Sequence, residues 1–386
     1  MSGEPFVLPP ELEEFRSAVR AICEDRLAKR AAEIDEQDEF PWDVHELFVE
    51  HDLMGVGYPE EHGGGGGGSL SMAVMVEEIA RVSASASLIP LVCRLGAIPV
   101  MLEGSAEQKD ELLGGISRGE HQMSYALTEP GSGSDAASMR TRYERIDGGF
   151  RLSGTKRFIT NAGASDRYTV FATRDPAERS RGISAFVVHA DDGGFSVGKS
   201  EKKMGIRGSP TREVYMEGVE IPRARLIGEE GQGFSHAMRT LDYSRPTIAA
   251  QALGIAQGAF DVAGRYAAER EQFGKSISEF QGIQFMLADM AIQIEAARML
   301  VYRAAAGCDA GDPRLTYFAS IAKAHASDTA MRVTTDAVQV LGGYGYMREY
   351  GVERMMRDAK ITQLYEGTNQ IQRLVIARQV LKALPS

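Results

Sequence analysis

One helical segment near the C-terminal end of this sequence constrains the fold more than any other feature. Apolar residues recur there in steps of four and three, at Ile283, Leu287, Met290, Ile294, Ala297, Val301 and Ala304. This spacing places all of them on one side of a long α-helix, and such a stripe packs against other helices in a bundle. Further long helices are predicted over residues 317–341 and 370–384, so we expect a helical bundle at this end of the chain.

The N-terminal part, residues 1–118, also has a helical pattern. Its first apolar residues follow helical spacing: Leu12, Phe15, Val19 and Ile22. A second helical stretch covers residues 72–80. The six consecutive glycines at 63–68 between them predict a loop, because glycine has too much backbone freedom for regular structure.

Residues 119–228 have a different pattern. Three short runs are typical of strands: Tyr168–Ala172, Ile183–His189 and Arg212–Met216. Turns that contain glycine or proline separate them. No helix of about 10–15 residues alternates with these runs, so a parallel βαβ sheet is not expected. We predict an α+β chain with an N-terminal α-helical domain (1–118), a middle antiparallel β domain in the form of a small barrel or sandwich (119–228), and a C-terminal α-helical bundle (229–386).

The charge of the chain excludes several kinds of partner. The 43 Lys and Arg residues against 54 Asp and Glu give a formal net charge of −11, and no basic run is present to neutralise phosphates. We therefore expect no nucleic-acid partner and no membrane partner. The most apolar segment, residues 87–102, contains Arg94 and two prolines, which argues against a membrane span. The N-terminal residues lack the pattern of a signal peptide, and three widely separated cysteines suit a reducing compartment, so we expect a cytoplasmic protein.

Several common catalytic chemistries lack their motifs. Residues 131–136 match GxGxxA, but a proline precedes them and a strand-like stretch follows, so a dinucleotide site is not expected. No Walker A sequence and no GxSxG elbow is present. The seven histidines show no ligand spacing, and we predict no metal site. The remaining possibilities are a carboxylate base or an organic cofactor that carries the chemistry.

Four segments combine small, hydroxyl-bearing and glycine residues that let backbone amides approach a ligand closely. They are Tyr125–Asp135 (YALTEPGSGSD), Arg157–Asn161 (RFITN), Arg270–Gly274 (REQFG) and Tyr365–Gln370 (YEGTNQ). Each segment alone is an ordinary turn sequence. Together, in this order and on an α–β–α layout, they resemble the acyl-CoA dehydrogenase family of flavoenzymes over nearly the whole chain.

The resemblance implies FAD as the cofactor. Leu127 and Thr128 would lie at the edge of the flavin ring, and Phe158, where most relatives have Trp, would cover the other side of the ring. Arg270 and Phe273 would contact the FAD diphosphate of a neighbouring subunit, which implies a homo-oligomer of at least two chains, as in a tetramer built as a dimer of dimers. The implied cofactor-binding residues are Tyr125, Ala126, Leu127, Thr128, Gly133, Ser134, Phe158, Ile159, Thr160, Arg270, Phe273, Gln281, Gln339, Val340, Leu341, Gly342, Gly343, Thr368 and Gln370.

The resemblance also implies a substrate and a catalytic residue. The family removes a proton from Cα and a hydride from Cβ of an acyl-CoA thioester to give the trans-2-enoyl product, and Glu366 matches the catalytic base. Branches of the isovaleryl type take the base from another helix and lack an acidic residue here, so this chain is similar to the short-, medium- or short-branched-chain groups. Pro90 and Leu91 match the floor of the acyl pocket, and their bulk favours a short or branched acyl group. The implied substrate-binding residues are Ser134, Asp242, Tyr243, Ser244, Arg245 and Gly367.

Local patterns leave simpler interpretations open for some of these residues. Asp242 and Arg245, near the expected start of a helix, could form an i,i+3 ion pair. Arg270 could pair with an adjacent glutamate. The helix after Glu366 is expected to begin with a capping box formed by Asn369 and Gln372.

Other functions within the same resemblance also remain open. An acyl-CoA oxidase, a dehydrogenase of acyl groups held on a carrier protein, and a non-catalytic binding homologue are the alternatives. The family's usual electron acceptor is an electron-transferring flavoprotein, which we expect as a partner. Acyl-chain length and branching, the choice between CoA and a carrier, the acceptor and the pathway are not determined by the sequence.

Overall fold

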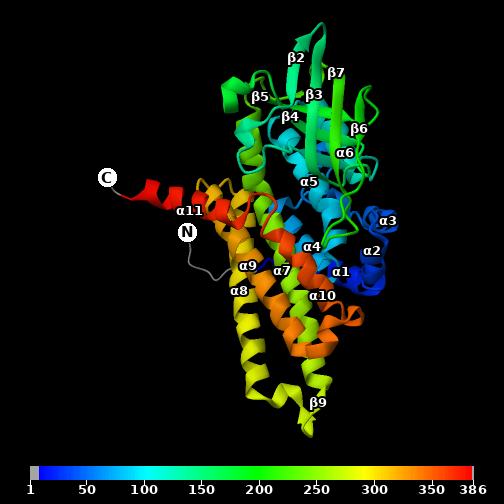
Figure 1. Ribbon diagram of the computed structural model, residues 1–386, viewed down its shortest axis with the longest axis vertical. Helices are drawn as coiled ribbons and strands as arrows, with labels where there is room; N and C mark the ends of the chain where they lie inside the picture. The colour runs from blue at the N-terminus through cyan, green and yellow to red at the C-terminus, as the bar shows by residue number, and fades with distance from the viewer. Residues whose placement is uncertain (1–7, 385–386) are drawn as a thin grey trace.

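Three long helices form the axis of the molecule in the computed structural model, which describes residues 8–384 (Figure 1). They are α7 (Gly233–Glu269), α8 (Gln281–Asp309) and α9 (Leu315–Leu341). The apolar stripe predicted for this region lies on α8, and from Met290 to Ala304 its members are buried against the neighbouring helices. A short two-stranded ribbon, β9 (Glu271–Gln272) and β10 (Lys275–Ser276), joins α7 to α8 at one end of the bundle.

Two shorter helices complete the C-terminal part. Helix α10 (Val352–Thr362) packs on α7 and α9, and α11 (Asn369–Ala383) begins beside α9 and then projects away from the body of the molecule (Figure 1). The large apolar side chains of the projecting helix are exposed: Leu374, Val380 and Leu381. Monomeric soluble proteins rarely expose several large apolar side chains on one helix in this way.

The N-terminal helices pack against the bundle and share one hydrophobic core with it. Their bounds are α1 (Pro10–Ile22), continued by a π-helical turn at Cys23–Leu27, α2 (Ala31–Gln37), α3 (Trp42–Glu50), α4 (Gly68–Val82), α5 (Ala84–Glu103) and α6 (Ala106–Ser117). The glycine run forms the predicted loop, except that Gly68 already belongs to α4. The contact between α4 and α7 is close because Gly254 and Gly258 of α7 lie against the backbone of α4.

Helix α5 is the most apolar helix of the described chain. Within residues 8–384 it is the one helix long and apolar enough to cross a membrane, but 83% of its apolar window is buried inside the protein. Burial of this kind is typical of a core helix.

The middle of the chain forms one eight-stranded sheet. Its order is β6-β7-β3-β2-β4-β5-β8, with β1 added beside β4. The strands are β1 (Met123–Ala126), β2 (Arg142–Ile146), β3 (Gly149–Thr160), β4 (Arg167–Thr173), β5 (Ile183–His189), β6 (Phe195–Val197), β7 (Thr211–Pro222) and β8 (Leu226–Ile227). Most pairs are antiparallel as predicted, but β1 and β2 each pair with β4 in parallel. The predicted order of helices, β domain and helices is confirmed.

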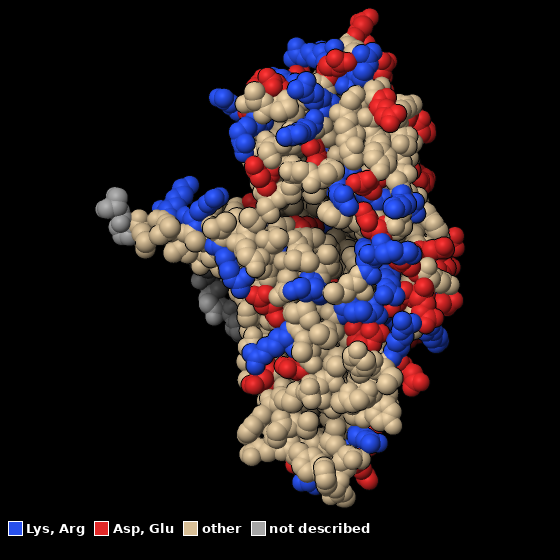
Figure 2. Space-filling view, in the orientation of Figure 1, with Lys and Arg blue, Asp and Glu red and all other residues tan. Residues whose placement is uncertain are grey.

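The β domain has its own apolar core and is fixed to α5 by buried polar contacts. The Asn161 amide donates to the carbonyl oxygen of Leu88 at 3.1 Å, and the Thr169 hydroxyl donates to that of Gly96 at 2.7 Å. Buried hydrogen bonds of this kind fix orientation as well as distance. The end of β3 and the strand β1 are therefore held beside the helical part, and Figure 2 shows the surface hollowed between the two.

Candidate active site

Glu366 lies in the turn between α10 and α11, and the backbone of this turn is unusual. Glu366 has φ of 50° and Gly367 has φ of 91°, so two successive residues adopt the left-handed region. Non-glycine residues rarely do so, and such strain is concentrated at functional sites. The Glu366 side chain reaches α7, where it meets Ser244.

The start of α11 differs from the sequence prediction. The expected capping box of Asn369 and Gln372 is wrong, because the N-cap is Thr368, whose hydroxyl accepts the N–H three residues later at 3.3 Å. Asn369 is buried against α9, where its amide has partners of its own. The Gln372 amide instead donates to the carbonyl oxygens of Glu366 (3.2 Å) and Gly367 (2.9 Å), so it stabilises the turn that carries the carboxylate.

The carboxyl group of Glu366 is buried and only partly hydrogen-bonded. Oε2 accepts the hydroxyl of Ser244 at 2.5 Å, whereas Oε1 is buried without a hydrogen-bond partner within the described chain. Burial raises the pKa of Glu366 from 4.5 to about 7, although the Ser244 hydrogen bond and the charges of Arg245 and Lys323 oppose the rise. A carboxylate of this kind titrates near neutral pH and has one oxygen available to a ligand.

The segment Asp242–Arg245 lies in the third turn of α7, farther from the start of the helix than expected because α7 already begins at Gly233. The predicted i,i+3 pair is present, with the Arg245 guanidinium 2.8 Å from Asp242. Asp242 also accepts the hydroxyl of Thr316 at 2.6 Å. Arg245 is buried and its Nε has no partner among residues 8–384, so the pair leaves a donor available beside the Glu366 turn.

Strand β1 brings Tyr125 to the same place. Its hydroxyl is buried without a partner within the described residues, and burial together with the nearby Glu366 carboxylate raises the pKa of Tyr125 well above its usual value. The next residues along the chain, Leu127 and Thr128, are partly exposed. Their carbonyl oxygens accept the Lys156 ammonium (3.1 Å) and the N–H of Arg157 (2.8 Å). These bonds fix the path of the segment across the sheet.

The remaining predicted flavin segments belong to the β domain and have different environments. Gly133 and Ser134 are on an exposed turn. Phe158 is 58% exposed at φ of 57°, next to a shift in the β3–β7 register. The Ile159 side chain, in contrast, is buried in the core of the β domain, so only its backbone can reach a ligand. The Thr160 carbonyl oxygen accepts the hydroxyl of Ser124 at 2.7 Å.

A second group of predicted residues meets at the far end of the bundle, beside the β9–β10 ribbon (Figure 1). Arg270, Phe273 and residues 340–343 line one groove of about 820 Å³ with mainly apolar walls. Phe273 is 93% exposed, and the Arg270 guanidinium lies 5.6 Å from the ring centre of Tyr344. An ion pair between Arg270 and an adjacent glutamate is absent from the described structure. Gln281, Gln339 and Gln370 are exposed outside the lining of this groove.

Several residues of the Glu366 site were not predicted from the sequence. Lys323 of α9 is fully buried, and its ammonium group donates to the carbonyl oxygen of Gly367 at 2.8 Å. The Tyr365 hydroxyl donates to Gln251 of α7, whose amide reaches α5 through Ser87 at 2.9 Å. Lysine and glutamine inside predicted helices could have been noticed as polar residues on apolar faces, but their partners are far away in the sequence.

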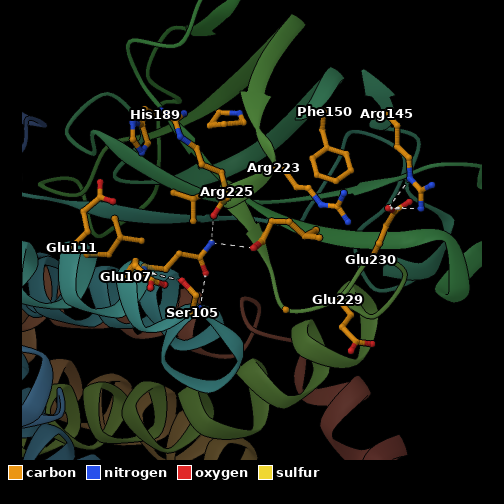
Figure 3. Close-up of a pocket in the computed structure, with 17 residues that line it drawn as sticks. Ser105, Glu107, Glu111, Arg145, Phe150, His189, Arg223, Arg225, Glu229 and Glu230 are labelled. Carbon is orange, nitrogen blue, oxygen red and sulfur yellow. Dashed lines mark hydrogen bonds and ion pairs between the residues drawn. The ribbon is translucent and has the colours of Figure 1, made fainter. Parts of the chain in front are cut away.

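Another cavity, between α6 and the β domain, contains none of the predicted site residues. Its volume is about 820 Å³ (Figure 3). Two of the arginines at its wall are paired, Arg145 with Glu230 at 2.9 Å and Arg225 with Asp192 at 2.6 Å. The Gln108 amide donates to two backbone carbonyl oxygens across the cavity wall, at 2.7 and 3.0 Å.

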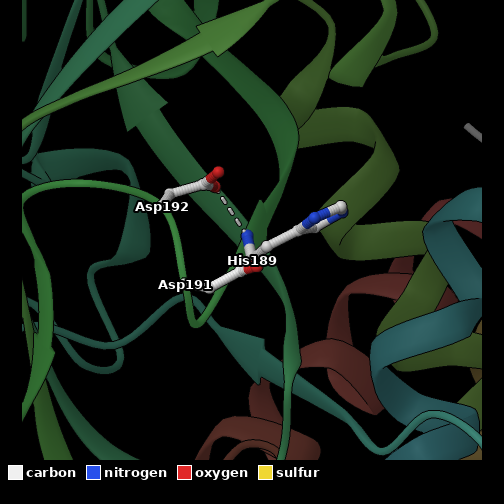
Figure 4. A group of neighbouring side chains, drawn as sticks. All are labelled: His189, Asp191 and Asp192. Atoms are coloured by element: carbon white, nitrogen blue, oxygen red, sulfur yellow. Dashed lines mark hydrogen bonds between the residues drawn. The ribbon is translucent and has the colours of Figure 1, made fainter.

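His189, Asp191 and Asp192 form a small cluster whose possible ligand atoms lie within 4.8 Å of one another (Figure 4). Asp192 accepts the backbone N–H of His189 at 2.8 Å and pairs with the Arg225 guanidinium at 2.6 Å. Arg225 therefore holds this turn, and the Asp192 carboxylate is already occupied by the arginine and by the backbone N–H of His189.

Comparison with known proteins identifies the family. Three family models match the chain: the N-terminal domain of acyl-CoA dehydrogenase over residues 9–120, the middle domain over 124–219 and the C-terminal domain over 231–381. The probable acyl-CoA dehydrogenase FadE25 of Mycobacterium tuberculosis is 53% identical over 381 residues, which cover 99% of this chain and 98% of the relative.

Solved structures agree with this result. Butyryl-CoA dehydrogenase from Megasphaera elsdenii superimposes with a TM-score of 0.94 at 43% identity, over 98% of this chain and 100% of that chain. A chain from the structure described as "Electron transferring flavoprotein of Acidaminococcus fermentans: Towards a mechanism of flavin-based electron bifurcation" gives a TM-score of 0.96 at 44% identity over the same shares. The protein therefore belongs to the acyl-CoA dehydrogenase family of FAD-dependent oxidoreductases.

Proposed function

We propose that the protein converts a short or branched saturated acyl-CoA thioester to its trans-2-enoyl-CoA, with Glu366 as the base that removes the α-proton. One observation carries this proposal: a buried carboxyl group with one oxygen held by Ser244 and the other oxygen without a partner in the described chain. Butyryl-CoA, named for the relative from Megasphaera elsdenii, is the acyl-CoA that we choose as the first substrate.

The environment of Glu366 suits proton abstraction from a weak carbon acid. A base with a pKa of about 7 accepts a proton more readily than an exposed glutamate, and about half of it is ionised in neutral solution. Each pKa unit of better matching between acid and base is worth about 1.4 kcal/mol. We propose that the backbone N–H of Glu366 donates a hydrogen bond to the thioester carbonyl oxygen, where it would stabilise the enolate-like charge. Gly367 allows the chain to lie close to the substrate.

The residues around this turn fit FAD. Besides Glu366 Oε1, the Tyr125 hydroxyl is buried without a partner in the described chain, and on the β domain Leu127 and Thr128 are partly exposed and Phe158 is exposed. When bound, FAD supplies the acceptor for the hydride that leaves Cβ. Leu127 and Thr128 would hold the ring edge, and Phe158 would shield one side of the ring from water.

The groove at the far end of the bundle supports a second part of the proposal, that two chains complete each FAD site. Arg270 has no acidic partner in the described structure, and a guanidinium suits a diphosphate because its donors match phosphate oxygens. We propose a tetramer built as a dimer of dimers, with the exposed apolar residues of α11 covered by another copy. An electron-transferring flavoprotein is the proposed acceptor, and the cytoplasm is the proposed location.

The test of the catalytic residue is Glu366→Gln, with Glu14→Gln at an exposed position of α1 as the matched control. The anaerobic rate of flavin reduction by butyryl-CoA is measured by the loss of flavin absorbance. We expect a loss of about 100-fold or more in Glu366→Gln, with FAD and product binding retained and the control unchanged. Near-normal reduction by Glu366→Gln would refute the assignment. A panel of thioesters differing in length and branching then defines the substrate.

The test of the shared cofactor site is Arg270→Ala. Removal of the guanidinium should weaken FAD retention, measured by flavin release during dilution and gel filtration. Arg265→Ala, on the same helix and outside the groove lining, is the control. Unchanged FAD affinity in Arg270→Ala would exclude the diphosphate role.

A further inference from the structure

Lys323 is a buried cation next to the proposed catalytic turn. It lies in the middle of α9 with no exposed surface, and its ammonium group donates to the carbonyl oxygen of Gly367 at 2.8 Å and to Oδ1 of Asn369 at 3.0 Å. Both acceptors are uncharged, so these bonds do not cancel the charge of the lysine. Burying a cation in this way costs free energy, which indicates a specific task.

The first task is to hold a strained backbone. The left-handed conformation of Glu366 persists only if surrounding contacts enforce it, whereas Gly367 adopts a positive φ without strain. Lys323 and the Gln372 amide both donate to the Gly367 carbonyl oxygen, from α9 and α11 respectively. Asn369 closes the turn from the other side, because its N–H donates to the carbonyl oxygen of Gln363 at 3.0 Å.

The second task is electrostatic. The charged and titratable groups that face Glu366 come from α7, α9, β1 and its own turn: Arg245 with its partner Asp242, Lys323 with the more distant Asp328, Tyr125, and Tyr365.

Two of these groups are cations, and they differ in how far they are neutralised. The charge of Arg245 is balanced by Asp242 at 2.8 Å. Asp328 is paired with Arg373 at 2.7 Å and accepts the Gln363 amide at 2.7 Å, and within the described residues it forms no ion pair with Lys323. Lys323 is therefore the less compensated cation near the carboxylate.

We propose that Lys323 is a positioning residue for the reaction: it fixes the Gly367 carbonyl so that the Glu366 carboxyl stays at Ser244, and its charge favours the ionised form of Glu366. This inference rests on the proposed role of Glu366 as the base. Burial lowers the pKa of Lys323 from 10.5 to about 7, and the Glu366 carboxylate opposes that change, as expected for two groups that stabilise each other's charge.

The experiment compares Lys323→Met with Gln372→Leu in the FAD-loaded enzyme. Methionine keeps the length of the lysine side chain but removes the charge and the donor. The Gln372 variant loosens the same Gly367 carbonyl oxygen, together with that of Glu366, without removing a charge. The rate of flavin reduction by butyryl-CoA is measured from pH 5.5 to 9, and the ionisation of Glu366 is followed by difference infrared spectroscopy, with Glu366→Gln as the blank.

We expect the acidic limb of the rate profile and the infrared titration of Lys323→Met to move to higher pH by about half a unit or more, because the carboxylate loses a stabilising charge. The rate of Lys323→Met relative to the parent protein should therefore be about threefold lower at pH values below the acidic limb than at pH values above it. Gln372→Leu should lose rate equally at all pH values, with its limb unmoved. If both variants show the same pH-independent loss, the electrostatic role is refuted.

Two further outcomes separate this inference from the proposed function. Near-normal flavin reduction by Glu366→Gln overturns the proposed base, and the inference with it. An inactive Glu366→Gln with an unmoved limb in Lys323→Met overturns the inference alone. If Lys323→Met does not retain FAD, Lys323→Gln, which keeps a donor toward Gly367 and removes only the charge, is measured in its place by the same criteria.

Discussion

The buried carboxyl of Glu366 makes the stability of the protein depend on pH in a way that one substitution can isolate. Burial raises the pKa of Glu366 from 4.5 to about 7, so the folded state binds the proton more tightly than the unfolded state. The resulting stability is fully present below pH 4.5 and is lost as the pH rises through about 7. Glu366→Gln replaces the carboxyl by a neutral amide of the same shape and abolishes this dependence.

The size of the effect follows from the two pKa values. At about 1.4 kcal/mol per pKa unit, the charged carboxylate costs the folded protein about 3 kcal/mol at pH 8 relative to acidic solution. The free energy of unfolding of Glu366→Gln, minus that of the parent protein, should therefore grow by about 3 kcal/mol between pH 4.5 and 8. The variant becomes relatively more stable at high pH although it loses activity, as expected where function requires a strained site.

The assay is urea-induced unfolding of the FAD-loaded proteins at a series of pH values with a fixed excess of FAD. Glu14→Gln, exposed on α1, controls for the exchange of glutamate for glutamine. A difference between Glu366→Gln and the parent that is constant from pH 5 to 8 would refute the reasoning, because it would mean that the Glu366 carboxyl remains solvated in the folded protein.

Two further predictions concern buried polar pairs and helix packing. Lys156→Met should lower the free energy of unfolding by about 3–5 kcal/mol, because it leaves the buried Glu129 carboxylate, 2.8 Å from the ammonium, without its cation; Lys156→Met with parent stability in urea unfolding would contradict this. On α7, Gly258→Ala should cost about 1–3 kcal/mol, because the added Cβ collides with a backbone carbonyl of α4, whereas Gly264→Ala on the same helix meets open space and should stabilise by about 0.5–1 kcal/mol. Equal thermal midpoints for the two glycine variants would show that the packing argument fails.

The sequence by itself determined the order of the helical and β parts and the position of the long helices α8, α9 and α11. The spacing of apolar residues from Met290 to Ala304 predicts which side of α8 is buried, because a helix repeats every 3.6 residues whatever it packs against. The motifs then identified the segments around Glu366, Arg270 and Leu127 through a resemblance to a family. These features are local, so one stretch of sequence contains all the information that they need.

Only the tertiary structure decided which groups meet. The hydroxyl that binds Glu366 comes from Ser244, 122 positions away, and the cation that holds the turn comes from Lys323 in another helix. The capping box was wrong for a related reason: Asn369 has partners on α9 that sequence reading cannot see, so its side chain is not available to cap α11. Burial and the pKa values that follow from it belong to the packed arrangement, because neighbours distant in sequence remove the water and supply the charges.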